Sequence, residues 1–245
     1  MANDQKPVIS VRKLRKVYMM GQEHVVALHN IDLDIPRGEV CCIFGTSGSG
    51  KSTLLNQLAG LEKPTRGVVR IGGVPISQLH ENQLAAFRQR HIGYVFQSYN
   101  LLPELTAAEN VAMPLMFKGI DPDVRLLEAK KMLCRVGLKD RMDHFPNQMS
   151  GGQQQRVGIA RAFVTHPEVV FADEPTGNLD TRTTKEVMHM IRAFAKRFHQ
   201  TIVLVSHDPE MTEYADRIVT LIDGRIVSNV ENQVKAEIDA APYIE

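Results

Sequence analysis

The residues best suited to chemistry lie in one glycine-rich stretch near the start of the chain. Gly45, four intervening residues and Gly50 are followed at once by Lys51 and Ser52. In such a loop, backbone N–H groups surround phosphate oxygens, the lysine reaches the β- and γ-phosphates, and the serine hydroxyl binds Mg²⁺. Thr53 would contact a more distal phosphate. The spacing therefore predicts a P-loop for a nucleoside triphosphate, made of Gly45, Thr46, Ser47, Gly48, Ser49, Gly50, Lys51, Ser52 and Thr53.

Two adjacent carboxylates, Asp173 and Glu174, end an apolar run over residues 169–172. Open α/β sheets bind ligands at the carboxyl edge of such strands. Because neighbouring strand residues point to opposite sides, we expect Asp173 to bind Mg²⁺ and Glu174 to reach an attacking water. Pro175 is expected to hold Glu174 extended, since proline disfavours the helical region for the preceding residue. The alternative is an ordinary acidic strand end followed by a turn.

A helical pattern begins after Ser150, Gly151, Gly152 and Gln153. Ser150 and Gln153 fit a capping box, which by itself needs no further function. Each glycine, however, costs about 1 kcal/mol relative to alanine in a helical turn. Their presence predicts that something approaches the backbone closely, as a phosphate does at a helix start. Because the P-loop already holds one triphosphate, this second site would serve a nucleotide held by another copy, which predicts a dimer.

Three further side chains are candidates by position. Gln97 and His207 each follow an expected strand of the same parallel sheet, so both could approach Mg²⁺ or the γ-phosphate. Tyr18, expected in a loop after the first strand, could stack on adenine. The alternatives are solvated polar side chains for Gln97 and His207, and a core or surface tyrosine for Tyr18.

Hydrophobic patterning places these residues on alternating strands and helices. Strands are expected over residues 8–12, 27–35, 41–44, 92–97, 169–172 and 201–205, and a short strand with a turn over residues 67–73. Helices are expected directly after the P-loop and over residues 106–118, 124–136, 153–166 and 181–198. A further βαβ-like stretch is expected after residue 205. This alternation predicts a mainly parallel sheet with a half-exposed antiparallel strand at 27–35 and a helical insertion after residue 97.

Composition limits the classes of function. The chain has 245 residues, is 43% hydrophobic and 23% charged, and carries a formal net charge of +1, so a nucleic-acid partner is not expected. No apolar run approaches the roughly 18 residues of a membrane span, so any membrane role is expected to be peripheral. Cys41, Cys42 and Cys134 lack metal-ligand spacing and are expected to be small core residues in the reducing cytoplasm.

Taken in order, these motifs resemble those of the ATP-binding cassette (ABC) family up to about residue 229. The resemblance assigns Tyr18 to the A-loop, residues 45–52 to Walker A, Gln97 to the Q-loop and residues 150–153 to the signature. It assigns Asp173 and Glu174 to Walker B, Asp180 to the D-loop and His207 to the switch. Met149 stands where the family commonly has leucine, a volume-conserving change.

The resemblance implies an α/β P-loop NTPase with a RecA-like core, an N-terminal antiparallel β part and an inserted α-helical subdomain. One ATPase domain would span residues 1–230, with the core at about 1–97 and 157–230, the helical subdomain at about 98–156, and a tail at 231–245. The implied cofactors are ATP and Mg²⁺, and the implied enzyme is an ATPase. Ser52, Gln97 and Asp173 would bind the metal, the catalytic residues would be Glu174, His207, Gln97 and Lys51, and Asp180 would help to bind the nucleotide.

More narrowly, residues 96–103, 150–157 and 172–180 are similar to the subfamily of macrolide exporters, lipoprotein-release ATPases and the cell-division ATPase. That similarity implies an ATP-bound homodimer on the cytoplasmic face of the plasma membrane, beneath permease subunits that have a large extracytoplasmic domain. It leaves open a separate subunit or an isolated domain of a fused exporter. It also leaves open export of lipoproteins, drugs or peptides, or a soluble regulator of the cell-division type that transports nothing.

The stretch after Gln97 is rich in apolar side chains. Some of them are expected to form a groove for a short helix of the membrane partner, linked to the nucleotide through Gln97. The alternative is that all of them pack internally. The residues concerned are Leu101, Leu102, Leu105, Met113, Leu115 and Met116.

Overall fold

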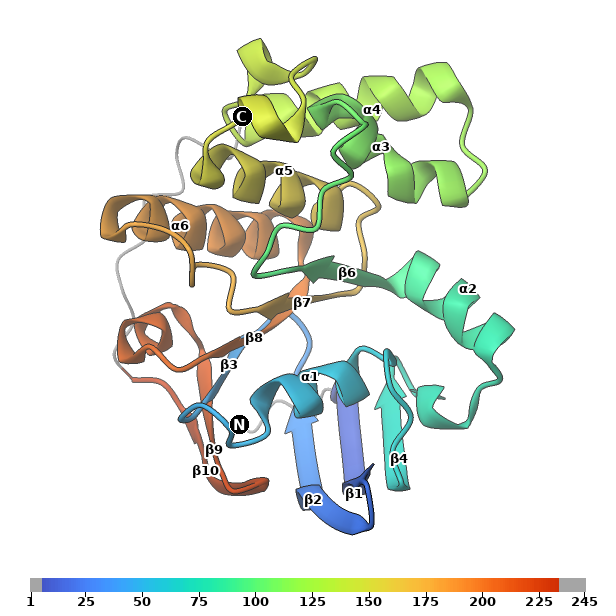
Figure 1. Cartoon of the computed structure of the whole chain (residues 1–245), viewed down its shortest axis with the longest axis vertical. Coiled ribbons are helices and arrows are strands. Elements are labelled where there is room, and N and C mark those ends of the chain that lie inside the picture. The colour runs from blue at the N-terminus through green and yellow to red at the C-terminus, as the bar shows by residue number, and fades with distance from the viewer. Residues whose placement is uncertain (1–5, 234–245) are drawn as a thin grey trace. The chain divides into compact units, whose positions relative to one another are not determined.

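The structure, a computed structural model, describes residues 6–233, which divide into two compact units. The first unit comprises residues 6–88 and 201–233, and the second comprises residues 89–200. Most of the expected tail at 231–245 lies outside the described residues. Because the first unit contains both residues 6–88 and residues 201–233, it includes the blue start and the red end of the chain in Figure 1.

An antiparallel sheet opens the first unit, in the strand order β2-β1-β4-β5. Its strands are β1 (Ile9–Met20), β2 (Glu23–Ile35), β4 (Arg66–Ile71) and β5 (Val74–Pro75), followed by a 3₁₀ turn at Ile76–Gln78. The prediction of a loop at Tyr18 was wrong, because β1 continues to Met20 and pairs Tyr18 with Val25. The reason is the β1–β2 hairpin, whose ladder extends the strand to the turn at Gly21.

The remaining strands of the first unit surround β3 (Val40–Phe44), which leads into the P-loop. β3 pairs in parallel with both β8 (Thr201–Ser206) and β9 (Arg217–Ile222). The prediction of a further βαβ-like stretch after residue 205 was wrong. A 3₁₀ helix at Pro209–Tyr214 leads to β9, and β10 (Arg225–Glu231) returns antiparallel to it. Asp223 and Gly224, both with positive φ, form the tight turn that makes this hairpin.

Helix α1 (Lys51–Leu58) follows the P-loop and contacts β8 and β2. Its predicted apolar face, Leu54, Leu55 and Leu58, is fully buried. Helix α2 (Glu81–His91) was not predicted. It buries only Leu84 and Phe87, so its sequence carries a weak apolar period.

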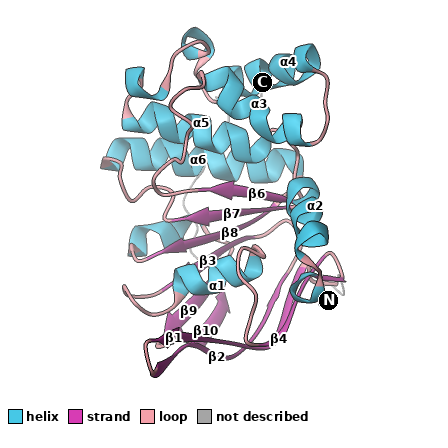
Figure 2. Ribbon diagram, turned by 45° about the vertical axis from the view of Figure 1, so that its right-hand side comes forward, coloured by secondary structure: helices cyan, strands magenta, loops and turns pink. Residues whose placement is uncertain are grey.

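The second unit pairs β6 (Ile92–Val95) in parallel with β7 (Val169–Asp173). Between these strands the chain forms α3 (Ala107–Phe117), α4 (Pro122–Arg135) and α5 (Gly151–Phe163), with 3₁₀ turns at Lys139–Arg141 and Pro146–Gln148. The helical insertion is thus confirmed. Helix α6 (Thr181–Phe198) follows β7, and Figure 2 shows α5 beside α6 with α3 and α4 beyond it. Within residues 6–233, no helix has the length and apolar character needed to cross a bilayer.

The cysteines divide into two groups. Cys41 and Cys42 are fully buried in β3, as predicted, and burial raises the pKa of both thiols, that of Cys42 to about 12. Cys134 is exposed on α4, so its expected core position was wrong. The helix buries the neighbouring Met132 and Leu133 instead, which turns Cys134 outwards.

Candidate functional site

The P-loop is shaped by close approach of two other strands of its unit. A Cβ at Gly45 would lie 2.3 Å from the carbonyl oxygen of Leu221 in β9. A Cβ at Gly50, where φ is 99°, would lie 2.8 Å from the carbonyl oxygen of Ala27 in β2. Because backbone atoms cannot yield as a flexible side chain does, both positions require glycine. Gly50 is also the N-cap of α1, so the loop leads straight into a helix start, where anions bind.

Two polar side chains inside the loop suit a phosphate. Lys51 is only 6% exposed, and its Nζ donates to the carbonyl oxygen of Thr46 at 2.8 Å. The buried Ser49 Oγ has no hydrogen-bond partner within the described residues. A buried ammonium group is costly unless negative charge compensates it, and one carbonyl dipole does so only partly. The loop therefore fits an anion that accepts hydrogen bonds.

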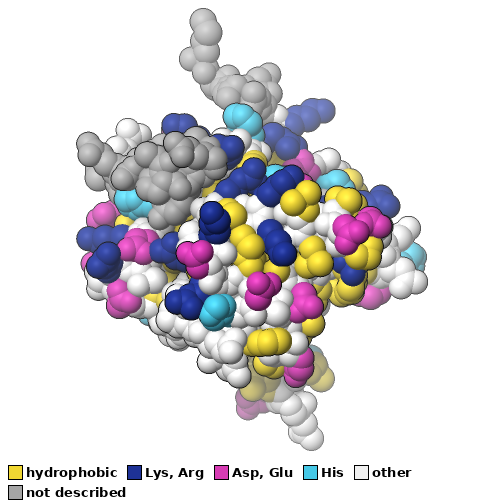
Figure 3. Space-filling model, turned by 90° about the horizontal axis from the view of Figure 1, so that it is seen from above, with side chains coloured by type: hydrophobic (Ala, Val, Ile, Leu, Met, Phe, Trp, Pro, Cys, Tyr) yellow, Lys and Arg dark blue, Asp and Glu magenta, His cyan; other side chains and the backbone are white. Residues whose placement is uncertain are grey.

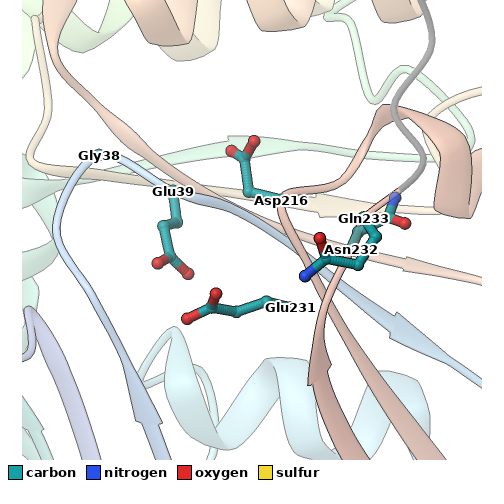
Figure 4. Close-up of a pocket in the computed structure, with 6 residues that line it drawn as sticks. All are labelled: Gly38, Glu39, Asp216, Glu231, Asn232 and Gln233. Atoms are coloured by element: carbon teal, nitrogen blue, oxygen red, sulfur yellow. The ribbon is translucent and has the colours of Figure 1, made fainter. Parts of the chain in front are cut away.

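A cavity of about 590 Å³ lies at the other end of β3 (Figure 4). Figure 4 shows the Glu39 and Glu231 carboxylates close to each other, with Asp216 nearby. Arg217 already pairs with Glu39, at 2.9 Å. Three carboxylates around one cavity disfavour phosphate, so this end of β3 is not the nucleotide site. The cavity is lined by Gly38, Glu39, Asp216, Glu231, Asn232 and Gln233.

Tyr18 and His207 belong to the same unit as the P-loop. The Tyr18 hydroxyl donates to Glu62 at 2.7 Å and shares a hydrogen bond with the Thr53 side chain. Ser206 is paired with Phe44 across β8 and β3, so His207 and the P-loop leave their strands at the same edge. The structure thus brings together the candidates that fall in the first unit.

In the second unit, Asp173 ends β7 and Glu174 follows it with a φ of 41°. The expectation that Glu174 is extended was therefore wrong. Two hydrogen bonds bend the chain here: Gly177 N donates to the Glu174 carbonyl at 3.1 Å, and Gln155 Nε2 donates to the Pro175 carbonyl at 2.5 Å. A non-glycine residue in this conformation costs about 1–3 kcal/mol, and such residues concentrate at active sites.

Gln97 lies against the same bend. Asn178 Nδ2 donates to the Gln97 carbonyl at 3.1 Å, and a Cβ at Gly177 would lie 2.8 Å from Gln97 Nε2. Asp180 is the N-cap of α6 and accepts hydrogen bonds from the backbone and hydroxyl of Thr183, which lower the pKa of Asp180. The Q-loop and Walker B candidates thus lie at one bend of the second unit, and the D-loop candidate caps the helix that follows it.

The signature residues form the predicted capping box at the start of α5. Ser150 Oγ accepts from Gln153 N at 3.3 Å, and Gln153 Oε1 accepts from Ser150 N at 2.9 Å. The close approach expected at the glycines is made by the chain itself. A Cβ at Gly151 would lie 2.8 Å from the Tyr99 hydroxyl, and one at Gly152 would lie 2.7 Å from Cγ2 of Thr183. Packing inside the unit already explains both glycines.

Several residues that shape these loops were missed from the sequence. Arg161 on α5 donates to the carbonyl oxygens of Tyr99 and Asn100 at 2.7 and 2.6 Å. Its burial lowers the pKa of the guanidinium to about 10. Gln155 and Glu62 were missed as well, because their partners lie 20 and 44 residues away and leave no local pattern.

Comparison with known proteins agrees with this geometry. The family described as ABC transporter matches residues 28–177. The uncharacterized ABC transporter ATP-binding protein YknY of Bacillus subtilis (strain 168) is 47% identical over 220 residues, which is 90% of this chain and 95% of that protein. ABC transporter H family member 2 of Dictyostelium discoideum is 44% identical over 239 residues, and the match covers 96% of this chain but 47% of the relative.

Longer and solved relatives extend the comparison. The macrolide export ATP-binding/permease protein MacB of Escherichia coli (strain K12) is 44% identical over 223 residues, and this chain spans 34% of its length. A dimeric structure of the ATP-binding cassette MJ0796, in a post-hydrolysis state bound to ADP and Pi, superposes with a TM-score of 0.85 at 40% identity. That match covers 91% of this chain and 98% of MJ0796. The chain belongs to the ABC transporter family as one of its ATP-binding cassettes, the modules that bind and hydrolyse ATP.

Proposed function

We propose that this chain binds Mg²⁺ and ATP, dimerises around the nucleotide, and uses hydrolysis to move a membrane permease. The observation that carries the proposal is the nearly buried Lys51 within a glycine cradle at a helix start. The ATPase domain would span residues 1–230, with a helical subdomain at about 98–156. The chain covers about half or a third of some relatives, so the membrane part is either a separate subunit or a further stretch of one polypeptide.

The proposed function assigns binding of phosphate, adenine and Mg²⁺ to particular residues. Lys51 and the backbone N–H groups of residues 45–50 would hold the phosphates, and Tyr18 would stack on adenine. Within residues 6–233 there is no cluster of three or more His, Cys, Asp or Glu that could hold a metal. By chemical type alone, the Ser52 hydroxyl, the Asp173 carboxylate and the Gln97 amide oxygen are ligands that Mg²⁺ accepts, and we propose them for that role. Mg²⁺ takes few protein ligands and completes its shell with phosphate oxygens and water. When bound, Mg²⁺ neutralises charge on the β- and γ-phosphates.

Glu174 would orient the attacking water and accept its proton, while His207 and Gln97 contact the γ-phosphate. The left-handed backbone at Glu174 fixes the direction in which its side chain leaves the strand. The capping box at Ser150 directs the start of α5, with Gly151 and Gly152, towards a nucleotide held by a second copy. The two MJ0796 structures are dimers, which supports association of two copies.

The proposed docking site for the membrane partner is an apolar pocket of about 410 Å³ in the second unit. Leu102 and Met116 are 43% and 44% exposed, whereas Leu115 is buried and Leu101 does not line the pocket. Figure 3, seen from the side where α3 and α4 lie, shows hydrophobic side chains gathered among charged ones. The lining residues are Leu102, Leu105, Glu109, Ala112, Met113, Met116, Phe117, Arg125 and Leu126.

Two relatives that are parts of transporters indicate what kind of membrane partner this cassette has. MacB is described as an ATP-binding/permease protein, and cbiO1 of Clostridium perfringens, 28% identical with a TM-score of 0.83, as part of the transporter complex cbiONQ. These descriptions support a membrane permease as the partner. From the subfamily resemblance we further propose that the cassette lies on the cytoplasmic face of the plasma membrane, beneath permease subunits with a large extracytoplasmic domain. A short amphipathic helix of the permease would lie in the pocket.

Glu174→Gln is predicted to lower kcat at least 100-fold while ATP binding persists, because the amide cannot accept the proton of water. The trapped ATP should then shift the protein from monomer to dimer, measured by light scattering with and without Mg²⁺ and ATP. Hydrolysis by this variant near the parent rate would show that another residue activates the water. A variant that binds ATP yet stays monomeric at every concentration would count against the dimer.

Gln155→Met is predicted to lower kcat about tenfold with little change in ADP affinity, because the bend that sets Glu174 loses its bond to the Pro175 carbonyl. Gln200→Met is the matched control. Gln200 is likewise buried in the second unit and donates to a proline carbonyl, that of Pro167, at 2.8 Å. Equal loss of kcat in both variants, measured with purified protein after confirming fold by circular dichroism, would reduce Gln155 to a stability role.

Met116→Glu and Leu102→Glu are predicted to reduce co-purification with the permease and permease-stimulated ATPase activity at least tenfold, since each places a charge in the apolar pocket. Basal ATPase activity of the isolated cassette should be unaffected. Leu127→Glu on α4 is the control, because Leu127 is 53% exposed and does not line the pocket. If the pocket variants matched this control, the permease would dock elsewhere.

A further inference from the structure

The ring of Tyr18 has a charged neighbour on one face. Lys16 lies two residues earlier on β1, so both side chains leave the same side of the strand. Lys16 Nζ is 4.9 Å from the centroid of the Tyr18 ring, within the range of a cation–π contact. A planar ligand that stacks on Tyr18 must therefore use the opposite face.

A single carboxylate fixes both side chains. Glu62 Oε2 accepts from the Tyr18 hydroxyl at 2.7 Å and lies 3.0 Å from Lys16 Nζ, which also donates to the Lys63 carbonyl at 2.9 Å. Glu62 Oε1 accepts from Asn56 Nδ2 of α1 at 3.3 Å. Through its bonds to Tyr18 and Asn56, Glu62 links β1 to the helix that begins at the P-loop.

This cluster is partly shielded from water. The side chains of Lys16 and Glu62 are 14% and 32% exposed. Burial by itself would raise the pKa of Glu62, but hydrogen bonds from Tyr18 and Lys16 outweigh it and lower that pKa. Burial and the Glu62 hydrogen bond raise the pKa of Tyr18. At neutral pH Glu62 is therefore a carboxylate and Tyr18 a neutral phenol, joined by a charge-assisted hydrogen bond.

We propose that Glu62 and Lys16 are positioning residues for the base of the nucleotide. They hold the Tyr18 ring so that one face meets Lys16 and the other is presented to adenine. This inference rests on the proposed role of Tyr18 as the adenine platform. Fixing the ring before binding removes an ordering cost that a mobile tyrosine would incur. The hydrogen bond between Tyr18 and Thr53 joins the platform to the first turn of α1, so base and phosphates are received by parts of one framework.

A merely structural ion pair is the competing explanation. Such a pair would stabilise the β1–β2 hairpin against α1, and its loss would lower stability without regard to the base of a ligand. A positioning role predicts instead that only ligands carrying a base are affected. Mg·ADP and Mg·pyrophosphate separate these cases, because they share a diphosphate and differ in the nucleoside.

The experiment measures both affinities by isothermal titration calorimetry, together with kcat and KM for ATP. Tyr18→Ala should weaken ADP binding about tenfold, as expected for one lost aromatic–base stack, and leave pyrophosphate affinity unchanged. Glu62→Ala should weaken ADP binding three- to tenfold, again sparing pyrophosphate and acting on KM more than on kcat. Glu62→Gln, which retains an acceptor for the phenol, should recover part of the affinity. Tyr18→Phe should resemble Glu62→Ala, and combining the two should add less than twofold.

Asp34→Ala serves as the control, because it removes an ion pair with Arg12 elsewhere on the same sheet. It should leave both ligands unaffected. Equal losses of affinity for ADP and pyrophosphate in Glu62→Ala would overturn the positioning role. So would an unchanged ADP affinity in Glu62→Ala if Tyr18→Ala weakened ADP binding. If Tyr18→Ala itself spared ADP, the adenine platform would fail, and the proposed function would lose that part while the Glu174 experiment remained independent of it.

Discussion

A nearly buried ammonium group is the constraint on which the first unit depends. Lys51 is 6% exposed, and its burial is costly unless dipoles and negative charge compensate it. The loop around it packs closely against carbonyl groups of β9 on one side and β2 on the other. The β1–β2 hairpin and the β9–β10 hairpin are therefore more than peripheral additions to β3. Their carbonyl groups contact the P-loop glycines, so the shape of the phosphate cradle is set by strands at both ends of the sequence.

In the second unit, one helix makes hydrogen bonds to both loops that carry candidate site residues. Helix α5 begins with the Ser150 capping box, donates through Gln155 to the loop after Glu174, and donates through Arg161 to the carbonyls of Tyr99 and Asn100. Tyr99, Asn100 and Glu174 all have positive φ. The left-handed backbone in both loops is thus hydrogen-bonded by side chains of α5, the same helix that begins at Ser150.

The sequence was informative where chemistry depends on spacing along the chain. The glycine-rich loop, the Ser150 capping box and the helices around residues 107–135 follow from local patterns, whereas the full fold class came from the resemblance of the ordered motifs to the ABC family. It was misleading where distant partners override a local preference. Tyr18 lies in a strand because β2 pairs with it, and Glu174 departs from the extended form because Gln155 and Gly177 bind the bend. Glu62 carries no local signal of its contact with Tyr18.

The cysteines offer a practical consequence. Cys41 and Cys42 are fully buried in β3, and their raised pKa values keep them protonated, whereas Cys134 is exposed on α4. Thiol reagents act on accessible thiolates, so alkylation of the native chain will be confined to Cys134. A dye or spin label attached without mutagenesis would therefore report on α4. Modification of Cys41 and Cys42 would require β3 to become exposed, so its rate would measure how often the strand that leads into the P-loop unfolds.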